Sequence, residues 1–262
     1  MDLQLEQRVA VVFGGASGIG RACVDVLVDE GADVLIVDRS KEGAAVSTGH
    51  RERGAAVDFI QADITKEADV RRAIAYAVDT YNGIDTVVAC AGISGPVGTA
   101  AADVAVQDWD QVMAVNVRGN FLIAKHAIPH LQRSEVGTVV LLASDSALVA
   151  FEGMTPYCVS KRAVLMLAKS LSVDHPPVRV NALCPGIVDT PMSRRDLSRP
   201  DGLAASGLPV AAPHQIARHA VFLASPVSAP INGTAVVSDF GYLARSAVGT
   251  LDFTDAAASG TA

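Results

Sequence analysis

The sequence lacks a hydrophobic run long enough to cross a membrane. Its most apolar stretch, residues 138–151, contains Asp145 and is shorter than the ~20 apolar residues that a membrane helix needs. No positively charged start followed by an apolar segment appears at residues 1–7, so no secretory signal is predicted. These absences favour a cytoplasmic protein with no membrane partner.

Cysteine is scarce, and its spacing forms no recognisable pair. The four cysteines are scattered without a Cys-x-x-Cys motif: Cys23, Cys90, Cys158 and Cys184. This pattern favours reduced thiols in the cytosol over a disulfide framework or a zinc site. The six histidines show no ligand spacing with carboxylates, and we predict no metal site.

Positive charge is also in short supply. Lys and Arg total 21 against 28 Asp and Glu, which gives a net charge of −7. The acidic excess lies in residues 1–131, which hold 18 acidic against 11 basic residues. No basic stripe with interleaved aromatics is present, so nucleic acid is not an expected partner. Hydrophobic residues make up 50% of the chain, enough to bury a sizeable core and to exclude disorder of the whole chain.

Short apolar runs alternate with helical stretches along the chain. We expect strands at Arg8–Phe13, Asp33–Val37, Val57–Gln61, Thr86–Ala89, Thr138–Ala143, Val178–Ala182 and Ala235–Ser238. We expect helices at Gly18–Glu30, Lys41–Arg53, Ala68–Tyr81, Trp109–Gln132, Tyr157–Val173 and Ile216–Leu223. Trp109 is expected to anchor the longest helix in the core. The alternation predicts an α/β fold with a three-layer, doubly wound parallel sheet (Rossmann-like).

We expect one domain over residues 1–248, and the motifs described next predict that this domain is both dinucleotide-binding and catalytic. Residues 189–213 are rich in Arg, Pro and Gly and are expected to form a long loop that acts as a substrate lid. The arginines of this loop either meet an anionic substrate or pair with neighbouring acids. Residues 249–262 are small and polar and are expected to form a flexible C-terminal tail.

A glycine-rich turn, residues 14–20, follows the first expected strand. Its glycines permit positive φ and a close approach of a ligand, and the next helix offers free N–H groups to a pyrophosphate. This position favours dinucleotide binding over a purely structural turn. Asp38 ends the second strand, where a carboxylate accepts ribose hydroxyls and repels a 2′-phosphate, which favours NAD over NADP. Arg39 complicates this choice, because a guanidinium stacks on adenine or pairs with a phosphate.

Tyr157 and Lys161 are four residues apart in an expected helix, so their side chains share one face. An isolated tyrosine has a pKa of about 10, and a neighbouring ammonium lowers that pKa. Such a tyrosine exchanges a proton during the interconversion of a carbonyl and an alcohol. Ser144 follows a strand end, where its hydroxyl can hold the substrate oxygen. Taken alone, the pair is equally a packed Tyr and an exposed Lys at a helix start.

These motifs occur together with Ala62-Asp63, Ala91-Gly92, Asn116, and Pro185-Gly186 followed by Thr190. From Val9 to about Ala244 the chain resembles the short-chain dehydrogenase/reductase family in its single-domain form. The resemblance implies the following catalytic residues: Asn116, Ser144, Tyr157 and Lys161. It implies that NAD is bound by Gly14, Ser17, Gly18, Ile19, Gly20, Asp38, Arg39, Asp63, Ile64, Ala91, Gly92, Tyr157, Lys161, Pro185, Gly186, Ile187 and Thr190.

The resemblance also assigns the catalytic roles. Tyr157 would be the acid/base, and Lys161 would lower its pKa and hold the nicotinamide ribose. Ser144 would orient the reacting oxygen, and Asn116 would support a water that relays protons. The implied enzyme is an NAD-dependent short-chain alcohol dehydrogenase or ketoreductase that acts on CH–OH groups and assembles as a homotetramer or homodimer.

The substrate is expected to be a small secondary alcohol or its ketone. Mostly apolar and small residues around the site favour a hydrophobic, cyclic or aliphatic substrate, although Asp145 hints at a second hydroxyl. A reductase of 3-oxoacyl thioesters on a carrier protein is an alternative that Asp38 and the acidic first half disfavour. A non-catalytic NAD-sensing protein is disfavoured by the complete set of catalytic groups.

Three sites depart from the family pattern without removing a catalytic group. Phe13 stands where Thr is usual, and Ala89-Cys90 replaces two Asn residues. Phe240 stands within a usual Asp-Gly-Gly sequence. We expect Cys90 to replace a hydrogen bond by packing.

Overall fold

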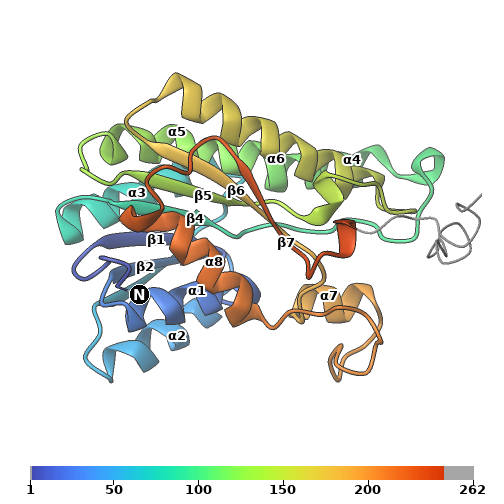
Figure 1. Ribbon diagram of the computed structural model, residues 1–262, viewed down its shortest axis with the longest axis horizontal. Coiled ribbons are helices and arrows are strands. Elements are labelled where there is room, and N and C mark those ends of the chain that lie inside the picture. The colour runs from blue at the N-terminus through green and yellow to red at the C-terminus, as the bar shows by residue number, and fades with distance from the viewer. Residues whose placement is uncertain (1, 245–262) are drawn as a thin grey trace, which may run out of the picture.

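A computed structural model describes residues 2–244, so the tail expected at residues 249–262 lies outside the described residues. Seven parallel strands form one sheet in the order β3-β2-β1-β4-β5-β6-β7 (Figure 1). Their bounds are β1 Val9–Phe13, β2 Asp33–Asp38, β3 Val57–Gln61, β4 Thr86–Ala89, β5 Thr138–Leu142, β6 Arg179–Pro185 and β7 Ala235–Ser238. The strand order reverses between β1 and β4, and ligands of such sheets bind at the carboxyl ends beside that reversal.

Helices cover both faces of the sheet, which confirms the three-layer α/β prediction (Figure 1). One layer contains α1 Gly18–Asp29, α2 Glu42–Arg51 and α8 Pro213–Ala224. The other contains α3 Glu67–Tyr81, α4 Val106–Met113, α5 Asn120–Leu131 and α6 Thr155–Asp174. Because both faces are covered, every residue of β1, β4 and β5 is buried, and these strands are continuously apolar rather than alternating. No helix within residues 2–244 has both the length and the apolar character required to cross a membrane.

Short helical turns connect the main elements. They are η1 Ala101–Asp103, η2 Ala114–Gly119, η3 Asp145–Ala147, η4 Pro226–Ser228 and η5 Tyr242–Ala244. Among these, η2 is a π-helical turn, and it joins α4 to α5 where the sequence predicted one unbroken helix. Such turns widen a helix locally and frequently occur at functional sites.

The prediction that Trp109 anchors this helix in the core is wrong. Trp109 is only partly buried, because α4 places a single residue, Val112, fully in the interior. The first turns of α4 therefore lie outside the core, and the packing of this layer comes from α5 and α6.

The segment 189–213 is not the unbroken loop that the sequence predicted. It contains α7, Pro191–Asp196, which begins because the Thr190 hydroxyl accepts from the N–H of Ser193 (3.2 Å) while the Ser193 hydroxyl accepts from the N–H of Thr190 (3.0 Å). A parallel bridge between Val188 and Ala211 ties the two ends of the segment together. Its action as a lid stays a prediction.

The expectation that Cys90 is accommodated by packing is confirmed. Its side chain packs against the core cluster beneath α1 and α8, which includes Cys23. The adjacent Cys90 thiol and burial together raise the pKa of Cys23 well above its usual range. Phe13, a second departure, is completely buried in the core cluster on the opposite face of the sheet.

Candidate active site

The glycine turn connects β1 to α1 in a conformation that only small residues tolerate. Gly14 and Gly18 adopt positive φ values of 81° and 53°, and a Cβ on Gly20 would overlap the carbonyl oxygen of Gly14. Ser17 occupies the N-cap of α1 without a side-chain hydrogen bond to the first turn. The first N–H groups of α1 are therefore available to an anionic group, as pyrophosphate binding requires.

Asp38 is fixed at the end of β2 by two backbone donors. Its Oδ2 accepts from the N–H of Ala16 (3.0 Å), and its Oδ1 accepts from the N–H of Ser40 (2.9 Å). Each oxygen keeps a further lone pair, so the carboxylate can also accept ribose hydroxyl protons. Arg39, directly after it, is exposed and lines the same groove.

One groove of about 350 Å³ runs past the carboxyl ends of the central strands. It is lined by fourteen of the predicted cofactor residues: Gly14, Ser17, Gly18, Ile19, Gly20, Asp38, Arg39, Asp63, Ile64, Ala91, Gly92, Tyr157, Lys161 and Thr190. Pro185, Gly186 and Ile187 do not line it; they lie at and just after the carboxyl end of β6. A Cβ on Gly92 would stand 3.4 Å from Lys161 Nζ, so this bare backbone leaves space for a flat ligand beside the catalytic groups.

Several residues that line the groove were not predicted as cofactor-binding, among them Thr65, Cys90, Gln111, Val115, Met192 and Arg195. Thr65 directly follows a predicted pair, and its N–H and hydroxyl both donate to Asp63 (2.9 and 2.7 Å), so its position in the motif was a usable signal. Gln111 and Val115 come from α4 and the π-helical turn. Nothing in their local sequence marks them, because the fold brings that segment to the groove from elsewhere in the chain.

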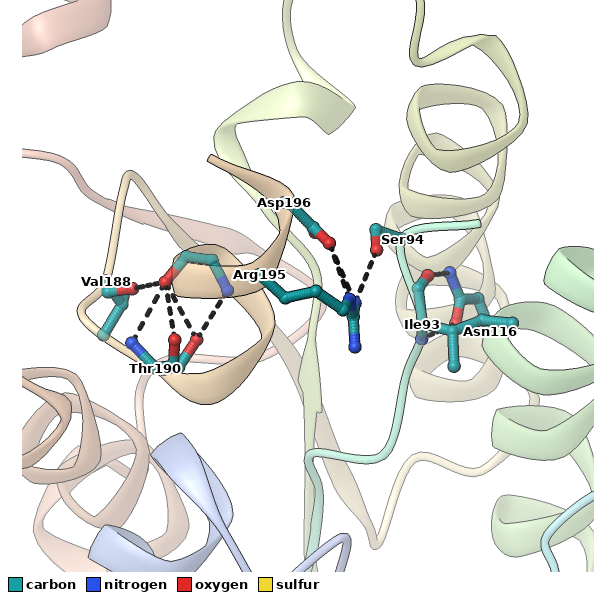
Figure 2. Close-up of polar contacts among 8 residues, drawn as sticks. Ile93, Ser94, Asn116, Val188, Thr190, Arg195 and Asp196 are labelled. Atoms are coloured by element: carbon teal, nitrogen blue, oxygen red, sulfur yellow. Dashed lines mark hydrogen bonds and ion pairs between the residues drawn. The ribbon is translucent and has the colours of Figure 1, made fainter. Parts of the chain in front are cut away.

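Asn116 lies in the π-helical turn and is completely buried. Its Oδ1 accepts from the N–H of Ile93 (2.9 Å), and its Nδ2 donates to the Ile93 carbonyl (2.8 Å) (Figure 2). The same Nδ2 also donates to Ser160 Oγ (2.9 Å). Asn116 thus ties the segment after β4 to α6, the helix that carries Tyr157 and Lys161. The predicted role in supporting a proton-relaying water stays a prediction.

Lys161 is buried beneath the groove with its Nζ 5.5 Å from the centroid of the Tyr157 ring. Its ammonium donates to the carbonyl of Leu142 (2.8 Å), which fixes it at the end of β5. Burial lowers the pKa of Lys161 to about 8, because the charged form has lost most of its water. The two side chains lie side by side on α6, as the sequence predicted, and the role of Lys161 in lowering the pKa of Tyr157 stays a prediction.

Tyr157 does not show the lowered pKa that the sequence predicted. Burial raises the pKa of Tyr157 to about 12, and the Ser144 hydroxyl offsets only part of that rise. The carboxylates of Asp145 and Asp196 act in the same direction as burial, because negative charge disfavours a phenolate. Tyr157 therefore keeps its proton at neutral pH.

Ser144 makes a hydrogen bond that the sequence did not predict. Its Oγ donates to Oδ1 of the adjacent Asp145 (2.8 Å), and the same Oδ1 accepts from the N–H of Ser146 (2.7 Å). Asp145 is only 6% exposed, and burial raises its pKa. The hydroxyl expected to hold the substrate oxygen thus has a buried carboxylate as its partner.

Two of the three arginines of segment 189–213, Arg194 and Arg195, are paired with carboxylates, as one of the two sequence interpretations required. Arg194 forms two hydrogen bonds with Asp189 (2.6 and 3.0 Å) and lowers the pKa of that carboxyl. Arg195 pairs with Asp196 (2.9 Å) and also donates to the buried Ser94 hydroxyl (3.1 Å), which links α7 to the segment after β4 (Figure 2). This contact places a guanidinium beside the opening of the groove.

Comparisons with known proteins agree with this geometry. The family model described as Enoyl-(Acyl carrier protein) reductase matches residues 14–243. The chain is 36% identical over 248 residues to 2-(R)-hydroxypropyl-CoM dehydrogenase of Xanthobacter autotrophicus, covering 90% of this chain and 99% of that protein. It is 34% identical over 249 residues to D-threitol dehydrogenase of Mycolicibacterium smegmatis, covering 92% and 95%. The solved structure of Thermoplasma acidophilum aldohexose dehydrogenase superposes with a TM-score of 0.85 at 28% identity, covering 96% of this chain and 100% of that one.

Fold and site together define an α/β oxidoreductase of the dinucleotide-binding type. The chain belongs to the short-chain dehydrogenase/reductase family, whose dehydrogenases generally use a nicotinamide cofactor.

Proposed function

We propose that this oxidoreductase interconverts a secondary alcohol and its ketone with NAD as the cofactor. The observation that carries the proposal is that a single groove contains both Asp38 at the glycine turn and the pair Tyr157 and Lys161. The relatives named above are dehydrogenases of hydroxyl-bearing molecules, which supports the same reaction here.

The residues present fit a dinucleotide. The glycine turn and the free N–H groups of α1 would hold the pyrophosphate, and Asp38 would bind the adenosine ribose. Asp38 supports NAD over NADP because its carboxylate would repel a 2′-phosphate. When bound, NAD supplies the hydride acceptor or donor for the carbinol carbon.

The chain's own groups manage the proton and the substrate oxygen. Tyr157 gives its proton to the oxygen during reduction and removes a proton from the alcohol during oxidation. Lys161 would stabilise the negative charge that develops on the phenol oxygen, and Ser144 would orient the substrate oxygen. Because burial holds the pKa of Tyr157 at about 12, we expect ketone reduction to be favoured at neutral pH and alcohol oxidation to gain as the pH rises.

The test is turnover of purified protein with NAD and a panel of cyclic, aryl and aliphatic secondary alcohols, followed by the ultraviolet absorbance of reduced nicotinamide. We expect turnover with NAD to exceed turnover with NADP. Tyr157→Phe should lower the rate by about 10²- to 10⁴-fold, since it removes the hydroxyl that exchanges the proton. Faster reduction of acetoacetyl thioester with NADPH would instead support the thioester reductase, and NAD binding without turnover of any alcohol would support a sensing protein.

We also propose a homotetramer or homodimer located in the cytoplasm. Large apolar side chains are exposed on the outer faces of α5 and α6 and around β7: Phe121, Met166, Val173, Val237, Phe240 and Tyr242. Burial of such patches between subunits would remove them from water. The four cysteines are free thiols, which suits a reducing compartment. Light scattering of the purified protein tests the assembly, and a monomer at micromolar concentration would contradict it.

A further inference from the structure

Asp145 is a buried carboxylate whose two oxygens have different surroundings. Oδ1 accepts two hydrogen bonds, from Ser144 Oγ and from the N–H of Ser146. Within residues 2–244 no donor reaches Oδ2. In that part of the chain, two side-chain polar atoms are both fully enclosed and without a hydrogen-bond partner: Asn120 Oδ1 and Ser146 Oγ. Asp145 Oδ2 also lacks a partner but is not one of these two, so it still borders accessible space.

Within residues 2–244, the groups that act on Asp145 include no positive charge. Oδ2 faces Gly186, where even an added Cβ would remain 3.8 Å away. Beyond Gly186 lies a second carboxylate, Asp239, whose oxygens accept from the backbone N–H groups of Gly241 and Leu243 (2.8 Å each). Lys161 directs its ammonium to the Leu142 carbonyl instead. A buried anionic oxygen without a donor is costly, so a donor from outside the chain would satisfy it.

We propose that Asp145 Oδ2 accepts a hydrogen bond from a second hydroxyl of the substrate, on the carbon next to the reacting one. This assigns vicinal diols and polyols as the substrate class and rests on the proposed function. Ser144 Oγ, which would hold the reacting oxygen, contacts the same carboxylate, so the two substrate oxygens need to be only one carbon–carbon bond apart. An ionised carboxylate only accepts, so a hydroxyl fits this position and an ether or ketone oxygen does not.

The first test compares three alcohols with the wild-type enzyme and NAD: cyclohexanol, cyclohexane-1,2-diol and 2-methoxycyclohexanol. A hydrogen bond to a charged group corresponds to about a 10- to 100-fold preference, so kcat/KM for the diol should exceed that for cyclohexanol by this factor. The methoxy compound should behave no better than cyclohexanol, because it has the second oxygen but no second donor. Equal kcat/KM values for all three alcohols would overturn the proposal.

The second test is Asp145→Asn. Because Ser144 and Ser146 both donate to Oδ1, the amide oxygen should stay at that position and the NH₂ group should replace Oδ2. The position then donates rather than accepts, so the preference for the diol over the methoxy compound should disappear or reverse. An unchanged ratio in this variant would overturn the proposal.

The matched control is Asp196→Asn, which removes another carboxylate that acts on Tyr157 but is paired with Arg195. Any change in its rates should be common to all alcohols, and the ratio of kcat/KM for the diol to that for cyclohexanol should stay at the wild-type value. If Asp145→Asn does not fold, the wild-type comparison of the three alcohols decides by itself. A fourth compound, 2-aminocyclohexanol, has an amino group in place of the second hydroxyl. A preference for this compound without a preference for the diol would overturn the assignment of a hydroxyl. Absence of turnover with every alcohol would refute the proposed function rather than this inference.

Discussion

Replacement of Lys161 by methionine should abolish activity and at the same time stabilise the folded chain at neutral pH. Lys161 is 4% exposed, and the bond that fixes its ammonium is the one to the Leu142 carbonyl. Burial is the main cause of its lowered pKa, and the nearby thiols Cys90 and Cys184 oppose that effect only partly. The folded protein therefore bears the cost of a desolvated charge that methionine would remove.

The magnitude follows from the pKa of this one group. A decrease from 10.5 to about 8 corresponds to a cost of about 3 kcal/mol while both folded and unfolded states are protonated, below pH 8. Loss of the hydrogen bond to the Leu142 carbonyl destabilises the variant by about 1 kcal/mol. Lys161→Met should therefore be more stable than the wild type by about 2 kcal/mol at pH 7. In the wild type, folding releases this proton between pH 8 and 10.5, so its stability rises with pH across that window. The advantage of the variant should therefore shrink across the same window.

The assay is urea unfolding of both proteins at several pH values from 7 to 10.5, together with turnover. Lys125→Met is the control, because this exposed lysine pairs with Glu67 on the surface and should change stability by less than about 0.5 kcal/mol. A Lys161→Met protein that is less stable than the wild type at pH 7, with a difference that does not vary with pH, would refute the reasoning.

Three further predictions follow from the backbone and the glycine turn. Gly20→Ala should destabilise the fold by about 1–3 kcal/mol and weaken NAD binding, because the added Cβ collides with the backbone. The added Cβ of Gly49→Ala meets no atom within 4 Å, so this change should stabilise α2 by about 0.5–1 kcal/mol in thermal unfolding. Asp38→Ser should lower the ratio of NAD to NADP kcat/KM by at least about 10-fold, and an unchanged ratio would remove Asp38 from cofactor selection.

The features that could be predicted from the sequence depend on short stretches of chain. The glycine turn, Asp38 at a strand end and the four-residue spacing of Tyr157 and Lys161 each follow from local geometry. The structure brings all of them to one groove because parallel strands present their carboxyl ends at one edge of the sheet. The continuous apolar strands were equally readable, because burial on both faces leaves a pattern that needs no knowledge of the partners.

The features that escaped prediction depend on contacts between distant segments. The π-helical turn has no sequence signal of its own, and the position of Trp109 depends on how little of α4 packs inside. The pKa of Tyr157 also depends on contacts between distant segments. The sequence showed its lysine neighbour, but burial and the carboxylate of Asp196 act on the phenol only after the chain has folded.

Asp145 connects substrate selection to proton transfer at this site. Its charge raises the pKa of Tyr157, and its Oδ1 is the partner of the Ser144 proton, so the ionised carboxylate opposes formation of a phenolate in two ways. A substrate hydroxyl that donates a hydrogen bond to Oδ2 would offset part of that charge. Asp145 would then oppose formation of the Tyr157 phenolate less strongly when the bound substrate has a second hydroxyl. An alcohol without a second hydroxyl would bind beside the same Tyr157, but the charge of Asp145 would not be offset. On this argument the diol preference should appear in kcat as well as in KM, because the donor that improves binding also lowers the pKa of Tyr157 and makes the proton-accepting phenolate easier to form.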